Sequence, residues 1–107
     1  MKLQKGDIII VDFNFFDSNV VKKRPACVLI EDENEVVLTE ITSKSRGISD
    51  ILIKKQDFKE GALKEDSWLR PLRLSTFHKS KVAYKIGHLK DNKISEIIGV
   101  ICGFLRK

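Results

Sequence analysis

Two short segments of the sequence carry side chains that can bind phosphate. The first is Lys22-Lys23-Arg24-Pro25, and the second is Thr42-Ser43-Lys44. A guanidinium group binds phosphoryl oxygens through two parallel hydrogen bonds, and a hydroxyl group supplies a further donor. If the two segments meet in space, they can stabilise the negative charge that builds up on a phosphate while a phosphodiester is cleaved.

A hairpin would bring these segments together. The polar stretch Glu31–Glu35 lies between them and is suited to a turn. If the chain turns at its centre, antiparallel pairing sets Pro25 opposite Thr42 and Arg24 opposite Ser43. Arg24 and Thr42 then become diagonal neighbours at one rim of the sheet. A slip of one residue would send the two side chains to opposite faces, and they would be an ordinary solvated arginine and an ordinary strand residue.

The rest of the sequence favours a small β-barrel closed by one helix. Six short segments rich in Ile, Val and Leu are expected to be strands: Asp7–Phe13, Pro25–Glu31, Glu35–Thr42, Asp50–Lys54, Trp68–Leu72 and Val82–Ile86. From Ile94 to Leu105, apolar residues recur at helical spacing behind Asp91-Asn92, which can cap a helix start. Gly99 and Gly103 are expected to let this helix pack closely on the sheet.

Composition and charge narrow the class of protein. The 107 residues are expected to form one domain, residues 1–107, and the formal net charge of +5 favours polyanions, although such an excess is also common as solubilising charge. The apolar runs are too short for a signal peptide or a membrane span, so we expect a cytoplasmic protein without membrane contact. Cys27 and Cys102 lie in apolar runs and are expected to be buried free thiols.

Five fragments of the sequence together resemble the MazF/PemK family of toxins. They are Lys5-Gly6-Asp7-Ile8-Ile9, Lys23-Arg24-Pro25-Ala26, Ile41-Thr42-Ser43, Asp66-Ser67-Trp68-Leu69-Arg70-Pro71 and Lys85-Ile86-Gly87-His88-Leu89, followed by the helix. Their order and spacing match over nearly the whole chain. The resemblance implies a mainly β fold, a small SH3-like barrel of the MazF/CcdB type with one C-terminal α-helix. This fold agrees with the expectation from the hydrophobic pattern.

The resemblance also implies a function, that of the toxin of a type II toxin–antitoxin system. Such a toxin cleaves single-stranded RNA at short sequence motifs without a metal or other cofactor, and Arg24 and Thr42 would be its catalytic pair. Attack by a 2′-hydroxyl group would leave a 2′,3′-cyclic phosphate and a 5′-hydroxyl. Arginine, whose pKa exceeds about 12, suits transition-state stabilisation better than proton removal. The expected partners are RNA, a cognate antitoxin with an acidic segment, and a second copy of the chain in a homodimer.

Further side chains are candidates for binding RNA. In the family the loop between the first two strands, here residues 14–22, covers the site, and its Ser18 and Asn19 could position RNA. Residues that flank the catalytic pair or follow the Asp66-Ser67 motif could contact phosphates: Lys22, Lys23, Ser43, Lys44, Arg46, Arg70 and Arg73. Each of these could equally be an ordinary surface residue.

Other kinds of site fit the sequence less well. A two-histidine ribonuclease would need His78 and His88 to converge on one phosphate. Trp68 and Phe77 could stack on RNA bases, although core or interface packing is more typical of such residues. A metal site would have to use aspartates that no tight spacing groups with a histidine: Asp7, Asp12, Asp50 and Asp66.

Two other functions remain open from the sequence. One is a gyrase-inhibiting toxin of the CcdB type, which shares the barrel but acts by binding a protein. The other is a barrel that binds RNA or protein without catalysis. Arg24-Pro25 together with Thr42 favours RNA cleavage, because gyrase inhibition requires no catalytic pair.

Overall fold

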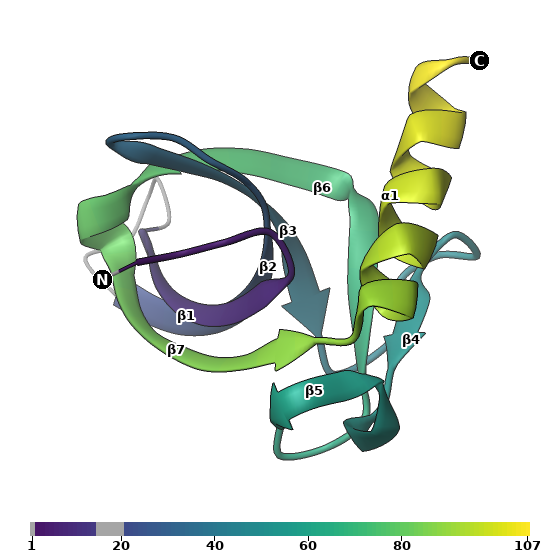
Figure 1. The fold of residues 1–107 in the computed structure, drawn as a ribbon, viewed down its shortest axis with the longest axis horizontal. Coiled ribbons are helices and arrows are strands. Elements are labelled where there is room, and N and C mark those ends of the chain that lie inside the picture. The colour runs from purple at the N-terminus through teal and green to yellow at the C-terminus, as the bar shows by residue number, and fades with distance from the viewer. Residues whose placement is uncertain (1, 15–20) are drawn as a thin grey trace.

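The chain folds into a curled antiparallel sheet with a C-terminal helix packed on its outside (Figure 1). The computed structural model describes residues 2–14 and 21–107. Their elements are β1 (Asp7–Asn14), β2 (Val21–Glu31), β3 (Glu35–Thr42), β4 (Ile51–Ile53), the 3₁₀ turn η1 (Lys55–Asp57), β5 (Phe58–Gly61), β6 (Ser67–His78), the 3₁₀ turn η2 (Lys79–Lys81), β7 (Val82–Leu89) and α1 (Asp91–Leu105). Within this part of the chain the strands form one sheet in the order β4-β6-β3-β2-β1-β7-β5.

The expected fold class is confirmed. All six expected strands are present, β3 with the expected bounds and the other five with adjusted bounds. Strands β4 and β5 lie at the two ends of this order and do not pair with each other. The curled sheet is therefore an incompletely closed barrel. Strand β6 runs well beyond the expected Trp68–Leu72, because its second half pairs with β3 even though it is mostly exposed. Strand β5 escaped prediction because it has four residues and buries only Phe58.

Alternation of side chains along the strands gives the sheet two apolar faces. The cluster inside the curl consists of Leu3, Ile9, Val11, Ala26, Val28, Val36 and Leu38. The cluster on the outer face joins the strands to α1 through buried residues that include Ile8, Cys27, Ile41, Leu69, Ile97 and Ile101. Because alternate residues of the central strands pack in different clusters, a one-residue slip in register would move each side chain into the opposite cluster.

Helix α1 differs from expectation at its start and in its glycines. Lys90 is the N-cap and makes no side-chain cap hydrogen bond, so the expected cap at Asp91-Asn92 is wrong. Asp91 is instead the first helical residue, where its negative charge interacts favourably with the positive end of the helix dipole. A Cβ atom placed on Gly99 or Gly103 would meet nothing within 4 Å, so these glycines do not pack on the sheet. Among the described residues, no helix has both the length and the apolar character that a membrane span requires.

The two cysteines differ in their surroundings. Cys27 is a buried free thiol, as expected, and burial together with the nearby charge of Asp7 raises its pKa to about 12. Its thiolate form is therefore negligible at neutral pH. Cys102 is only half-buried, because it borders a shallow cavity between α1 and β2 that Leu29 and Ile98 also line.

Asp7 is a fully buried carboxylate that ties the N-terminal segment to β7. Its Oδ2 accepts a hydrogen bond of 2.8 Å from the backbone N–H of Gln4. Its Oδ1 accepts one of 2.8 Å from Nδ1 of His88 and lies 3.1 Å from Nζ of Lys85. The hydrogen bond to Asp7, helped by the charges of Asp7 and Glu60, raises the pKa of Lys85 above its ordinary value and outweighs the opposing effect of burial.

Candidate active site

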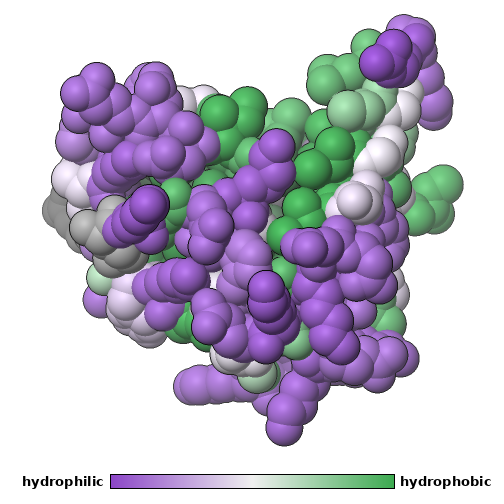
Figure 2. All heavy atoms as spheres, viewed as in Figure 1, coloured by the Kyte–Doolittle hydropathy of each residue, from purple (hydrophilic) through white to green (hydrophobic). Residues whose placement is uncertain are grey.

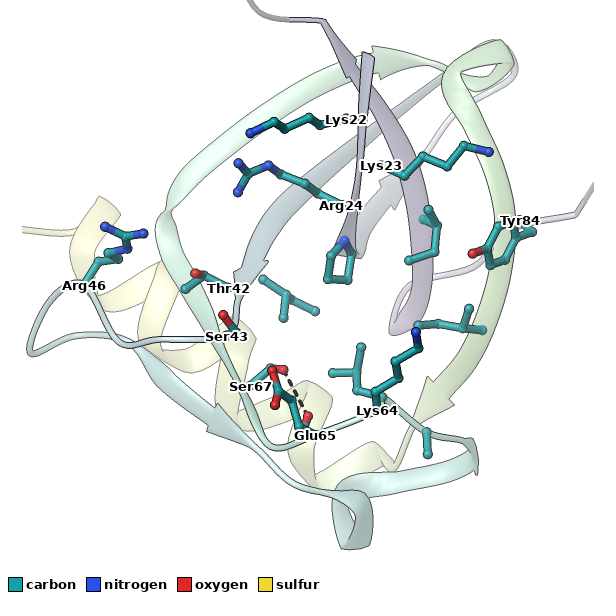
Figure 3. A pocket seen from close by; sticks show the side chains of 16 residues that line it. Lys22, Lys23, Arg24, Thr42, Ser43, Arg46, Lys64, Glu65, Ser67 and Tyr84 are labelled. Atoms are coloured by element: carbon teal, nitrogen blue, oxygen red, sulfur yellow. Dashed lines mark hydrogen bonds between the residues drawn. The ribbon is translucent and has the colours of Figure 1, made fainter. Parts of the chain in front are cut away.

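A cavity of about 740 Å³ opens between the start of β2, the end of β3 and the connection from β5 to β6. Figure 3 looks into this cavity. Its polar lining among the described residues consists of Lys22, Lys23, Arg24, Thr42, Ser43, Arg46, Lys64, Glu65, Ser67 and Tyr84. Apolar side chains, among them Ile10, Pro25, Ile41 and Ile86, complete the walls.

The pairing of β2 with β3 differs by one residue from the expected hairpin. A β-bulge at Leu29 adds one residue to β2. Beyond the bulge Ala26 pairs with Glu40, and continuation of that register by two residues brings Arg24 level with Thr42. The expected register, which set the proline opposite Thr42, is therefore wrong. Because of the bulge, the register aligns Arg24 with Thr42 and does not place them on a diagonal, although the two strands no longer pair at this point.

Pro25 opens the cavity by ending the pairing between β2 and β3. From Val21 to Pro25 strand β2 pairs with β1 alone, whereas its pairing with β3 begins at Ala26. Proline has no N–H to donate to a neighbouring strand. Strands β2 and β3 separate at this point, and the space between them forms part of the cavity. The strand was expected to begin at Pro25. It begins at Val21 instead, because pairing with β1 extends past the proline.

Arg24 and Thr42 are both half-buried and both line the cavity. Arg24 pairs with the fully buried Val11 of β1, so its aliphatic stem starts above the apolar interior. Figure 3 shows Arg24 and Lys22 extending from one side of β2, the side where Thr42 lies, and Lys23 from the other side. A guanidinium group and a hydroxyl group thus reach into the same part of the cavity.

The other RNA-binding candidates fall into three groups. The cavity is lined by Lys22, Lys23, Ser43 and Arg46. Lys44 is exposed outside the cavity, and Arg70 is held elsewhere, with its Nε 3.7 Å from Oδ1 of Asp50. Ser18 and Asn19 lie outside the residues that the structure describes.

Asp50 holds the loop from which Arg46 enters the cavity. Its Oδ2 accepts hydrogen bonds from the backbone N–H groups of Arg46 at 2.6 Å and Gly47 at 3.0 Å, and from Oγ of Ser45 at 3.3 Å. The Asp50 side chain is only 3% exposed. A carboxylate that accepts several backbone donors fixes a loop that has no regular structure. Arg46 therefore projects from a supported loop, although its own side chain is exposed.

The histidines do not form the two-histidine site, because neither of them lines the cavity. The ring of His78 contacts the hydroxyl group of Ser80 at 2.9 Å, and His88 donates to the buried Asp7. Within the described residues, no group of three or more His, Cys, Asp or Glu side chains could hold a metal ion.

The aromatic residues weighed for base stacking also lie elsewhere. Phe77 packs edge-to-face on Phe13, with ring centroids 4.9 Å apart. Trp68 lies in β6 between Thr42 of β3 and Leu52 of β4. Neither of them lines the cavity.

Sequence analysis missed Lys64, Glu65 and Tyr84, which line the cavity. Lys64 and Glu65 belong to a charged run that looks like any solvated turn. Tyr84 lies in β7, which approaches the cavity only because β7 pairs with the far side of β1. Its 49% exposure makes it the aromatic side chain best placed to stack on a base in this cavity. The only feature of the sequence that could have pointed to Tyr84 was an aromatic residue with a polar hydroxyl group in a predicted strand.

The cavity is strongly cationic. Among its described lining residues, five side chains are lysine or arginine and one is a carboxylate. A cleft lined by one sign of charge concentrates ligands of the other sign. The guanidinium of Arg24 and the hydroxyl of Thr42 can bind the oxygens of a phosphoryl group as its negative charge grows. The arrangement therefore suits a phosphodiester of a flexible polyanion.

Comparison with known proteins points in the same direction. The sequence matches the family described as PemK-like, MazF-like toxins of type II toxin–antitoxin systems over residues 4–105. No curated protein matches. The fold resembles an endoribonuclease in complex with its cognate antitoxin from a mycobacterial species, with a TM-score of 0.77, 13% identity and coverage of 97% of this chain and 95% of that chain. It also resembles the Mycobacterium tuberculosis toxin MazF-mt6, with a TM-score of 0.73, 19% identity and coverage of 94% and 96%.

Proposed function

Because the chain belongs to the family of PemK-like, MazF-like toxins of type II toxin–antitoxin systems, we propose that it is a toxin that cleaves single-stranded RNA without a metal ion. The observation that carries this proposal is the cationic cavity in which Arg24 and Thr42 reach the same space. The positive charge of a guanidinium can do the work that a metal ion does in other nucleases. Cleavage at short sequence motifs is part of the proposal.

The proposed chemistry is attack by a 2′-hydroxyl group on the adjacent phosphorus. Negative charge then grows on the phosphoryl oxygens, where Arg24 binds it in a bidentate manner and Thr42 donates a further hydrogen bond. The bond to the 5′-oxygen breaks, which leaves a 2′,3′-cyclic phosphate on one product and a 5′-hydroxyl on the other. No water molecule is consumed in this step.

RNA would cross the cavity along its cationic walls. Lys22, Lys23 and Arg46 are placed to contact neighbouring phosphates, and Ser43 can donate a hydrogen bond to one of them. The half-exposed ring of Tyr84 offers a surface on which a base can stack. Side chains of this kind fit a single strand, whose bases are free to turn toward protein.

The test is a cleavage assay with purified protein and a mixed-sequence single-stranded RNA in the presence of EDTA. The RNA should be cut, and mass spectrometry of the fragments should find 2′,3′-cyclic phosphate and 5′-hydroxyl ends. Cleavage that requires an added divalent metal would contradict the metal-free mechanism. If no RNA were cleaved under any condition, inhibition of gyrase or binding without catalysis would become the better account.

We also propose two protein partners. A second copy of the chain would cover the apolar surface at α1, where Leu105 is 74% exposed and Ile30 of β2 is 58% exposed. Figure 2 shows hydrophobic residues gathered beside and along this helix. Contiguous exposed apolar surface is typical of protein interfaces. The cognate antitoxin would place an acidic segment in the cavity, because cationic side chains that attract phosphates also attract carboxylates.

Both partners can be tested with one set of solution measurements. Light scattering of the protein alone should give about twice the chain mass of 12.2 kDa, and Ile30→Glu should lower that mass toward the monomer. The antitoxin, or an acidic peptide cut from it, should displace a fluorescent RNA whose 2′-hydroxyl groups are methylated. A monomer at every concentration would contradict the homodimer. Simultaneous binding of peptide and RNA at full affinity would contradict the shared cavity.

A further inference from the structure

The proposed reaction needs a group that takes the proton from the 2′-hydroxyl, and the catalytic pair does not supply one. Guanidinium and ammonium groups are hydrogen-bond donors with no lone pair that could accept a proton, so Arg24 and the lysines of the cavity cannot serve as bases in that form. The hydroxyl of Thr42 is far too weak a base. Carboxylates and neutral histidines are the side chains that usually accept such a proton.

Glu65 is the carboxylate in this cavity. Among the described residues that line it, no other is an aspartate, a glutamate or a histidine. Glu65 lies two residues before the buried Ser67, whose Oγ donates a hydrogen bond of 3.0 Å to the backbone oxygen of Glu65. This hydrogen bond fixes the turn that carries Glu65. Figure 3 shows the side chain pointing from the turn toward the end of β3, where Thr42 and Ser43 lie.

Strand pairing brings this turn close to the catalytic pair. Thr42 pairs with Trp68 of β6, and Glu65 precedes Trp68 by three residues. An extended strand advances about 3.3 Å per residue. The backbone of Glu65 can therefore lie no more than about 10 Å from that of Trp68, the residue paired with Thr42.

Three carboxylates in the surrounding strands and loops are already engaged. Asp50 accepts the hydrogen bonds of the loop that carries Arg46, and Glu60 lies 3.6 Å from Nζ of Lys85. Glu40 accepts a hydrogen bond of 2.9 Å from Arg73. The carboxylate of Glu65 makes no hydrogen bond or ion pair with the described residues, so its oxygens are available to a substrate.

We propose, building on the proposed RNA cleavage, that Glu65 is the general base. Its carboxylate takes the proton of the 2′-hydroxyl while the 2′-oxygen forms a bond to phosphorus. The bond from phosphorus to the 5′-oxygen breaks, and that oxygen takes a proton from water. The proton on Glu65 then returns to solvent. Arg24 and Thr42 stabilise the phosphoryl oxygens throughout, so Glu65 acts on a different atom of the substrate.

The experiment compares single-turnover cleavage by the wild type and Glu65→Gln across pH 4 to 9, on an RNA that the wild type cuts. Glu65→Gln should cleave about a hundredfold to a thousandfold more slowly near neutral pH. The wild-type rate should fall at acidic pH, where carboxylates take up a proton. The rate of the variant should instead rise with hydroxide concentration through neutral pH. Glu65→Asp should recover part of the lost rate, because it restores a carboxylate.

Binding separates a catalytic role from a structural or electrostatic one. Glu65→Gln removes a negative charge from a cationic cavity, so it should bind a 2′-O-methylated RNA as tightly as the wild type or more tightly. The control Glu33→Gln changes an exposed carboxylate in the β2–β3 turn and should leave rate and pH profile unchanged. A Glu65→Gln variant with the wild-type rate and acid limb would overturn the proposal, as would a loss of RNA binding equal to the loss of rate. A wild type that cleaves no RNA would overturn the proposed function as well.

Discussion

Replacement of Arg24 by alanine should lower the rate of RNA cleavage by at least about a hundredfold, because it removes the charged donor that binds the phosphoryl oxygens. Arg24→Lys should restore only part of the rate, since an ammonium group is a point charge that cannot bind two oxygens in a fixed plane. Thr42→Ala should cost about tenfold to a hundredfold, because a neutral hydroxyl stabilises a developing dianion less than a guanidinium does. Single-turnover cleavage at saturating enzyme measures all three effects.

The fold should survive these substitutions, because the side chains of Arg24 and Thr42 border the cavity and leave the apolar clusters intact. Circular dichroism and the thermal midpoint should stay close to those of the wild type. Arg73→Ala is the matched control: Arg73 is also an arginine beside the hairpin, but it contacts Glu40 and lies outside the cavity. Its cleavage rate should remain within about twofold of the wild type. An Arg24→Ala variant as fast as Arg73→Ala would exclude the proposed role of Arg24.

Replacement of Asp7 by asparagine should lower the free energy of unfolding by about 3 kcal/mol. Asp7 accepts from the backbone of Gln4, from His88 and from Lys85, whereas an asparagine amide must turn its own N–H donors toward at least one of these groups. The substitution also leaves the partly buried Lys85 without its nearest anion. In a domain of this size the thermal midpoint should fall by about 12–20 °C.

Glu60→Gln is the control for this substitution. Glu60 contacts the same lysine at 3.6 Å, but its side chain is 66% exposed, so its loss should cost less than about 0.5 kcal/mol. Urea unfolding of both variants gives the comparison. Equal midpoints would show that the buried carboxylate of Asp7 stabilises the fold no more than an exposed one.

The stabilising effect of Asp7 should also depend on pH in a defined direction. The pKa of Lys85 is raised in the folded protein above its ordinary value of 10.5. The stabilisation from its pairing with Asp7 is therefore complete below that ordinary value and is lost as the pH rises through the raised pKa. The difference in stability between wild type and Asp7→Asn should shrink above about pH 10.5.

The sequence alone was enough for every described strand except β5, for the helix and for the catalytic candidates. Short segments rich in Ile, Val and Leu marked the six expected strands, and apolar residues at helical spacing marked α1, because these patterns reflect burial of local elements. Arg24 and Thr42 were candidates because a guanidinium and a hydroxyl group can bind a phosphate, and the resemblance to the MazF/PemK family implied that they form the catalytic pair. Both residues line the cavity.

Only the tertiary structure decided the register of the hairpin and the rest of the cavity. Nothing in the sequence reveals the bulge at Leu29, because Ala26–Ile30 is a continuous apolar run without an alternation that an extra residue could interrupt. Glu65 and Tyr84 reach the cavity through pairings between strands that are distant in sequence. Arg70 stands in a family-like motif, yet the buried Asp50 holds it away from the cavity. Local patterns show which side of a strand is buried. The residues that a side chain contacts depend on long-range strand pairing, and local patterns carry no information about that pairing.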